Sequence, residues 1–284
     1  MNKSSEKNEV GDKDLKIFID TLKNLSDYDF SGYSDKSLKR RLSKVLLDSK
    51  MTLPMLLERL RSNKSFLEEI VKSITVNTTE LFRDPPAWNT LRQEILPLYL
   101  DKPEIIIWHA GCSTGQEVYS MLILLSEMDL FDKARVYATD INSDVLTFAS
   151  EGIYRYKFNV NYLDNFDKVI RQNRNGELID VPYSKYFTID KTRDQIKMNQ
   201  FLLEKPVFKK QNLVRDPNPF PVSYDIIICR NVVIYFNYEL QNKVFKLFHD
   251  VMKTGGSLLL GVHETILGPV SSFFIKKNQV YYKK

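Results

Sequence analysis

Two glycines and one aspartate have the spacing expected of a site for a nucleoside cofactor. Gly111 and Gly115 enclose three small residues in the pattern Gly-x-x-x-Gly, and Asp140 follows 25 positions after Gly115. Glycine lacks the Cβ that would hold the backbone away from a ligand. The pattern is neither the Gly-x-Gly-x-x-Gly of dinucleotide sites nor the Gly-x-x-x-x-Gly-Lys-Ser/Thr of phosphate loops, and it contains no lysine to hold a phosphate. It therefore favours a cofactor without phosphates, such as S-adenosylmethionine.

Asp140 has two possible roles. It ends the strand-like segment 135–140, and an aspartate at a strand tip can accept hydrogen bonds from both hydroxyls of a ribose. It could instead cap a helix that begins near Asn142 or Ser143. Because the glycine pattern precedes it in register, we favour the ribose-binding role.

Alternating strand and helix patterns position these residues. The short apolar run at 105–108 is typical of a strand buried on both faces, the run at 224–229 indicates another buried strand, and 135–140 and 257–262 also read as strands. Helical patterns follow the first three runs, and residues 272–282 resemble a closing hairpin. This order predicts an α/β fold with a Rossmann-like, mostly parallel sheet and an antiparallel C-terminal hairpin.

The rest of the chain divides into further parts. We expect a disordered tail at 1–14, an all-helical domain at 15–75, and a cofactor-binding domain at 76–284 with a small antiparallel insert at about 155–210. One helix of the N-terminal domain has a basic face formed by Lys36, Lys39, Arg40 and Lys44. Such a face is either simply solvated or a docking surface for an acidic protein partner.

Composition limits the classes of function. The net charge of +5 is too small to indicate a nucleic-acid partner. The polar N-terminus has no apolar signal segment, and no run approaches the roughly 18 apolar residues of a membrane span. Cys112 and Cys229 lack metal-ligand spacing and are interpreted as reduced, buried thiols. We expect a cytoplasmic, monomeric protein that neither inserts into a membrane nor holds a metal.

Five motifs make the chain resemble the CheR-type chemotaxis receptor methyltransferases from about residue 15 to its end. They are Thr-Val-Asn-Thr-Thr-Glu-Leu-Phe-Arg at 75–83, Ser-Thr-Gly-Gln-Glu-Val-Tyr-Ser at 113–120, Ala-Thr-Asp-Ile-Asn at 138–142, Gly-Ile-Tyr at 152–154 and Cys-Arg-Asn-Val-Val-Ile-Tyr-Phe at 229–236. The resemblance implies a class I methyltransferase sheet, an N-terminal all-helical domain and a small β insert. It implies S-adenosylmethionine-dependent esterification of glutamate side chains on the cytoplasmic helices of chemoreceptors.

The resemblance also implies a set of cofactor contacts. Besides Gly111 of the glycine pattern, they are Asn77, Thr79, Arg83, Glu117, Asp140, Asn212, Leu213, Arg230 and Asn231. A guanidinium suits the methionine carboxylate, an acid suits its ammonium, and an apolar slot edged by amides suits adenine. Other roles are open to several of them: Asn77 and Thr79 could cap helices, Arg230 could form a surface ion pair, and Asn231 could serve a turn.

Two substitutions depart from the family pattern. Gln116 replaces a second acid and Val118 replaces a proline, whereas Glu117 is retained. The first part of the insert, at 156–185, is also longer than usual, which affects substrate docking more than chemistry.

Tyr235 and Arg83 are the candidate catalytic residues. A glutamate side chain with a pKa of about 4.3 is already ionised at neutral pH, so no general base is needed. The enzyme must align the acceptor oxygen and exclude water. A hydroxyl from Tyr235 could orient the acceptor, with Arg83 on the cofactor or guiding the substrate. Tyr235 could instead be a packing aromatic beside Phe236.

Docking by a receptor tether is predicted to be absent. In the family, some members hold a receptor's C-terminal pentapeptide through a glycine-bearing turn of the insert. Here the corresponding turn, Asp190 to Asp194, contains no glycine, and other residues resist positive φ values. We therefore expect recognition to depend on the basic face at residues 36–44.

Two other functions are open. One is methylation of another protein, a small molecule or a nucleic acid. Methylation of base amino groups usually accompanies an Asp/Asn-Pro-Pro-aromatic motif, where this chain has Cys229-Arg230-Asn231. The other is a non-catalytic module that senses S-adenosylmethionine, which the presence of Asp140, Arg83 and Tyr235 argues against.

Overall fold

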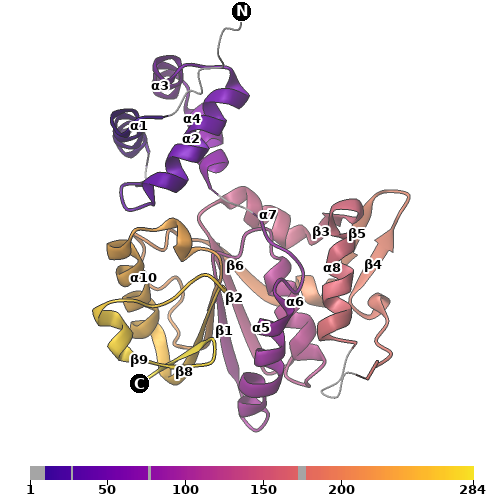
Figure 1. The fold of residues 1–284 in the computed structure, drawn as a ribbon. Helices are drawn as coiled ribbons and strands as arrows, with labels where there is room; N and C mark the ends of the chain where they lie inside the picture. The colour runs from indigo at the N-terminus through magenta and orange to yellow at the C-terminus, as the bar shows by residue number, and fades with distance from the viewer. Residues whose placement is uncertain (1–9, 27, 76–77, 172–176) are drawn as a thin grey trace, which may run out of the picture. The chain divides into compact units, whose positions relative to one another are not determined.

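The computed structural model describes residues 10–26, 28–75, 78–171 and 177–284 (Figure 1). Within these ranges, no helix has the length and apolar character needed to cross a bilayer. The chain forms two compact units. One combines the N-terminal helices with residues 234–241, and the other contains the sheet and its covering helices.

The helical unit is built from α1 (Asp12–Leu25), α2 (Asp35–Ser49), α3 (Leu53–Ser62) and α4 (Lys64–Ile74). Each helix buries one apolar face in a shared core that includes Phe18, Leu42 and Leu56. Residues 12–14, which we expected in the disordered tail, form the first turn of α1. Residues 234–241 belong to this unit, and the ring of Phe236 lies 5.0 Å from that of Tyr33, which packs against the core.

The second unit is organised around a seven-stranded sheet. Its strands lie in the order β6-β2-β1-β7-β8-β10-β9. They are β1 (Ile105–Ala110), β2 (Ala134–Asp140), β6 (Pro206–Lys210), β7 (Tyr224–Cys229), β8 (Met252–Leu260), β9 (Phe274–Lys277) and β10 (Val280–Lys283). The first five strands of the order are parallel, and β10 and β9 are antiparallel. The predicted mostly parallel sheet with an antiparallel C-terminal hairpin is confirmed.

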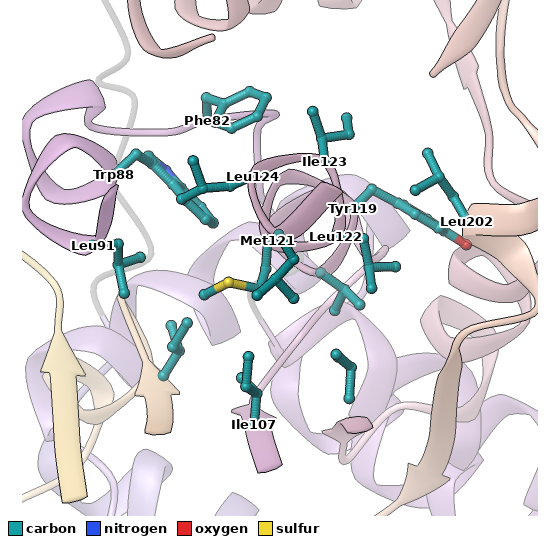
Figure 2. Packing of buried hydrophobic residues seen from close by; sticks show 14 of the residues in the cluster. Phe82, Trp88, Leu91, Ile107, Tyr119, Met121, Leu122, Ile123, Leu124 and Leu202 are labelled. Atoms are coloured by element: carbon teal, nitrogen blue, oxygen red, sulfur yellow. The ribbon is translucent and has the colours of Figure 1, made fainter. Parts of the chain in front are cut away.

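Helices cover both faces of this sheet (Figure 1). Alternate side chains of β1 point to opposite faces. Ile107 joins the core beneath α6 (Gln116–Ser126), whereas Trp108 packs 5.4 Å from Phe248 of α10 (Tyr238–Val251). Nine of the eleven residues of α6 are buried. Its apolar side chains share a core with Trp88 of α5 (Pro85–Thr90), Phe166 of α8 (Tyr156–Val169) and Leu202 beside the insert, and Figure 2 shows Trp88 and Leu202 near this helix. The N-terminus of α6 is therefore held rigidly at the end of β1.

The insert is a three-stranded antiparallel sheet in the order β3-β5-β4. Its strands are β3 (Ile153–Arg155), β4 (Phe187–Asp190) and β5 (Gln195–Met198), flanked by α8 and α9 (Gln200–Leu203). Residues 206–210, which we expected in the insert, form β6 and pair with β2 in the large sheet. The remaining helices are α7 (Ser143–Glu151), the π-helical turn η1 (Leu91–Ile95), and the 3-10 turns η2 (Leu96–Tyr99), η3 (Tyr183–Lys185), η4 (Val233–Tyr235) and η5 (Pro269–Phe273).

The turn between β4 and β5 differs from our expectation. Asp190 Oδ1 accepts hydrogen bonds from the backbone N–H groups of Thr192 and Arg193, at 2.9 and 3.0 Å. Asp194 adopts a φ of 55°, in the left-handed region. Aspartate tolerates this region better than most residues, so the lack of a glycine does not prevent a positive φ here.

Candidate cofactor and active site

The loop that follows β1 is the first part of the site. Gly111 and Gly115 have φ values of 82° and 88°, which favour glycine. A Cβ on Gly111 would lie 2.5 Å from Val232 Cγ2, and one on Gly115 would lie 2.8 Å from Ala149 Cβ. The space left by these glycines is therefore filled by protein neighbours, whereas the sequence pattern suggested clearance for a ligand.

Asp140, at the end of β2, binds this loop through hydrogen bonds to the backbone. Its Oδ2 accepts a hydrogen bond from Ser113 N at 2.9 Å, and its Oδ1 accepts one from Asn142 N at 3.0 Å. Burial raises the pKa of Asp140 above its ordinary 3.8, although the backbone hydrogen bonds partly oppose this. The cap of α7 is Asn142, whose Oδ1 accepts a hydrogen bond from Asp144 N at 2.9 Å. Each carboxylate oxygen can accept a further donor.

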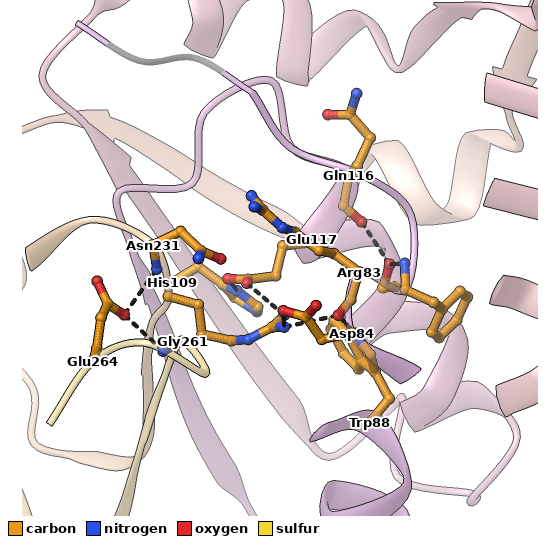
Figure 3. A network of polar contacts seen from close by, with 12 residues as sticks. Arg83, Asp84, Trp88, His109, Gln116, Glu117, Asn231, Gly261 and Glu264 are labelled. Atoms are coloured by element: carbon orange, nitrogen blue, oxygen red, sulfur yellow. Dashed lines mark hydrogen bonds and ion pairs between the residues drawn. The ribbon is translucent and has the colours of Figure 1, made fainter. Parts of the chain in front are cut away.

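A buried network of charges lies beside the loop (Figure 3). Glu117, in the first turn of α6, has its Oε1 3.0 Å from His109 Nδ1 and its Oε2 3.2 Å from Arg230 Nη1. The Arg230 side chain is 3% exposed, and its Nη2 also lies 2.8 Å from Asp84 Oδ2. Burial raises the pKa of Glu117, but the hydrogen bond from His109 and the charge of Arg230 outweigh it, so the net pKa is lowered. Glu117 is therefore held as an anion.

The backbone of Arg83 is fixed by several neighbours. Its carbonyl oxygen accepts hydrogen bonds from Trp88 Nε1 at 2.9 Å and from Arg230 Nη2 at 2.8 Å. The adjacent Phe82 and Asp84 have φ values of 52° and 57°, which is uncommon for residues other than glycine. Such strain persists where surrounding contacts over-determine a conformation and is frequent at functional sites. The Arg83 guanidinium makes one long contact, 3.4 Å from Nη1 to the carbonyl oxygen of Thr78.

The segment after β6 lies at the same edge of the sheet. Gln211 N donates to the carbonyl of Asp140 at 2.9 Å, which brings residues 211–213 next to the tip of β2. Asn212 forms a local turn, because its Oδ1 accepts from Val214 N at 3.0 Å. Leu213 is buried. Gln211 itself was not predicted: its amide is buried, and its Oε1 has no partner among the described atoms.

The structure thus groups most of the predicted cofactor residues. Its sheet unit brings together Arg83, Gly111, Glu117, Asp140, Asn212, Leu213, Arg230 and Asn231 around the carboxyl ends of β1, β2, β6 and β7. Thr79 is half-buried in the segment leading to Arg83. Asn77 lies outside the described residues. Arg230 does not form the surface ion pair that was the alternative prediction, because its own side chain is buried and pairs with Glu117 and Asp84.

Tyr235 belongs to the helical unit. The guanidinium carbon of Arg41 lies 5.2 Å from the centre of its ring, and Ser34 N donates to its carbonyl oxygen at 2.8 Å. On α2, Lys36, Arg40 and Lys44 are exposed. Lys39 instead forms an ion pair with Asp12 of α1, so the exposed basic face has three of the four predicted residues.

These features suit an S-adenosyl group. Asp140 offers acceptors for ribose hydroxyls, and Glu117 offers a fixed negative charge for an ammonium. Ser113 Oγ, beside Asp140, and Gln211 Oε1 are both buried and have no hydrogen-bond partner among the described atoms. Because buried polar groups are normally hydrogen-bonded, both atoms could bind a polar ligand. His109, Ser113 and Gln211 were not predicted as site residues. Ser113 lies within the glycine pattern and the 113–120 motif, His109 lies two residues before Gly111, and Gln211 directly precedes Asn212, so their nearness to predicted residues was the available signal.

Comparisons with known proteins agree with this geometry. Residues 77–282 match the SAM-binding domain of CheR methyltransferases, and residues 13–75 match the all-alpha domain of the same proteins. The chain belongs to the CheR methyltransferase family, and it is an S-adenosylmethionine-dependent methyltransferase.

Individual relatives match along most of the chain. A Pseudomonas putida protein named "Putative methyltransferase Cher3" is 33% identical, and the match spans 93% of this chain and 92% of that protein. The chemotaxis protein methyltransferase of Listeria innocua is 26% identical, and the match spans 96% of this chain and 98% of the relative. The chemotaxis protein methyltransferase of Borreliella burgdorferi is 32% identical, and the match spans 71% of this chain and 69% of the relative.

Proposed function

We propose that this enzyme transfers the methyl group of S-adenosylmethionine to glutamate side chains of bacterial chemoreceptors, forming glutamyl methyl esters during adaptation in chemotaxis. The observation that carries the proposal is the match to both CheR domains in the same order, over residues 13–75 and 77–282. Relatives from Listeria innocua and Borreliella burgdorferi bear the name chemotaxis protein methyltransferase, which supports the same acceptor class.

We assign the cofactor to the carboxyl edge of the sheet. Asp140 would hold the ribose, Glu117 the ammonium, and residues 211–213 the adenine, with Gly111, Arg83, Thr79, Asn77, Arg230 and Asn231 as further contacts. The lowered pKa of Glu117 supports its role, because an ammonium requires an ionised partner. The cofactor supplies an electrophilic methyl group when bound.

The active site must also align the acceptor carboxylate with the methyl group. The acceptor carboxylate is ionised at neutral pH, so a hydroxyl that orients one of its oxygens suffices. We assign that role to Tyr235, which follows Asn231 by four positions. Arg83 would guide the acceptor, and its fixed backbone supports a defined direction for its side chain.

The basic face of α2 is our candidate for the receptor docking surface. Lys36, Arg40 and Lys44 are spaced four residues apart, and all are exposed. This spacing places them along one side of the helix. Such a stripe would attract the acidic cytoplasmic helices of a receptor and would be screened by salt over about a Debye length. Methylation should weaken as salt is raised, and it should fall in a Lys36/Arg40/Lys44→Glu variant.

Independence from a receptor tether is part of this proposal. The β4–β5 turn reaches a positive φ at Asp194 without a glycine, so the absence of glycine does not argue against a tether. The prediction depends on the basic face alone. Micromolar binding of a receptor C-terminal peptide to the insert, together with methylation that does not respond to salt, would show that the docking surface lies on the insert instead.

One labelling experiment tests the acceptor class. The protein is incubated with methyl-labelled S-adenosylmethionine and membranes from its own cells. We expect base-labile label on a receptor-sized band, because carboxyl methyl esters hydrolyse in base. Base-stable label, or label only on other proteins or small molecules, would contradict the proposal. Cofactor binding without any transfer would indicate a sensing module.

A further inference from the structure

A buried carboxylate in the loop after β8 binds the backbone of the segment that follows β7. Glu264 is 8% exposed. Its Oε1 accepts a hydrogen bond from Val232 N at 2.8 Å, and its Oε2 accepts bonds from Asn231 N at 2.8 Å and Gly261 N at 2.6 Å. Bonds from N–H groups to an ionised acceptor are stronger than those between neutral groups. This one side chain therefore ties together the ends of two neighbouring parallel strands.

The segment that Glu264 holds is in an unusual conformation. Asn231 has a φ of 60°, in the left-handed region, where a residue other than glycine needs support from its surroundings. Gly261 permits the close approach, because a Cβ there would lie 2.8 Å from Glu264 Oε2 and 2.9 Å from Asn231 N. Two hydrogen bonds to Glu264, from Asn231 N and Val232 N, therefore support the left-handed conformation of this segment.

The same segment contacts the glycine loop of the cofactor site. Val232 Cγ2 would be 2.5 Å from a Cβ on Gly111, so its side chain packs directly over that glycine. Arg230, the preceding residue, holds Glu117 and the carbonyl of Arg83. A shift of residues 231–232 would therefore be transmitted both to the glycine loop and to the buried charge network.

We propose that Glu264 is a positioning residue for cofactor binding: it holds residues 231–232 against Gly111 so that Asn231 and the glycine loop keep the shape the cofactor requires. It acts through backbone hydrogen bonds rather than through contact with the cofactor. The inference rests on the proposed assignment of Asn231 to the cofactor site.

The test is Glu264→Gln, which keeps the size of the side chain but replaces one oxygen with an N–H donor. That donor would face a backbone N–H, so at least one of the three hydrogen bonds is lost. We expect the affinity for S-adenosylhomocysteine, measured by titration calorimetry, to fall about tenfold or more. Hydrogen exchange at the Asn231 and Val232 amides should accelerate relative to the wild type.

The matched control is Asp225→Asn at the opposite end of β7. Asp225 Oδ2 accepts bonds from Ile106 N at 2.8 Å and from Lys253 Nζ at 2.7 Å, so its loss also removes a partly buried carboxylate that holds a backbone N–H. It should lower the unfolding temperature yet change the affinity less than about twofold. Equal loss of affinity in both variants would mean that general destabilisation is responsible and would overturn the inference.

A second variant tests the proposal if Glu264→Gln does not fold. Gly261→Ala would place a methyl group between Glu264 Oε2 and Asn231 N, so it disturbs the hydrogen bond that joins them and should weaken cofactor binding in the same direction. Affinity within twofold of wild type in either folded variant would refute the role of Glu264. If Asn231→Ala also leaves the affinity unchanged, the assignment of Asn231 fails instead, which separates the two ideas.

Discussion

Replacing Asp140 with asparagine should weaken cofactor binding more than any exposed charge change nearby. The carboxylate accepts one bond from Ser113 N at 2.9 Å and one from Asn142 N at 3.0 Å. Asparagine retains one acceptor oxygen, but its amide N–H group would face one of these backbone donors. Leaving one buried N–H unpaired costs about 1–3 kcal/mol of stability, against a typical total of about 5–15 kcal/mol.

Besides lowering stability, Asp140→Asn should weaken cofactor binding. If both ribose hydroxyls bond to the carboxylate, loss of its charge removes the charge assistance from two hydrogen bonds, about 1.4–2.8 kcal/mol. That range corresponds to roughly a tenfold to hundredfold weaker affinity. Asp140→Ala leaves both backbone donors unpaired and should cost about 2–6 kcal/mol of stability, so asparagine is the less disruptive variant.

Titration calorimetry with S-adenosylmethionine and S-adenosylhomocysteine measures the affinity, and chemical denaturation without ligand measures the stability. Asp144→Asn is the matched control, because it makes the same charge change at an exposed position in the first turn of α7. A folded Asp140→Asn protein with wild-type affinity would refute the assignment of Asp140 to the cofactor. A similar loss in Asp144→Asn would show that net charge, not the ribose contact, controls binding.

Three further predictions concern the active site and its charge network. Tyr235→Phe should lower kcat while cofactor affinity stays near that of the wild type; unchanged turnover would identify Tyr235 as a packing residue. Because the folded-state pKa of Glu117 is lowered, its stabilising contribution should be present above its ordinary value of 4.5 and lost as the pH falls through the folded-state pKa. Denaturation at a series of pH values should therefore show the stability difference between wild type and Glu117→Gln shrinking in acid, and a constant difference would contradict this. Arg230→Lys should cost about 2 kcal/mol or more in denaturation, because one ammonium cannot replace the forked contacts to Glu117, Asp84 and the Arg83 carbonyl; a loss below about 0.5 kcal/mol would show that the network contributes little.

Local patterns in the sequence were sufficient for the main elements of the fold. The β-branched run at 105–107 became β1, the run ending at Asp140 became β2, and the helical periodicity before residue 75 became four helices. These features depend on residues close together in the chain, whose spacing is directly visible. The end of the insert was misjudged, because pairing of β6 with β2 joins segments about 70 residues apart.

The sequence alone was enough to predict that Asp140 stands at a strand tip after a glycine loop, because strand length and loop spacing are both local features of the chain. It did not determine that Val232 fills the space over Gly111, or that Arg230 pairs with Glu117 and Asp84. Nor did it show that Glu264 holds the backbone after β7. These contacts become visible only in the folded protein, because each joins side chains or backbone groups from separate elements. Whether they meet depends on which strands lie next to each other in the sheet.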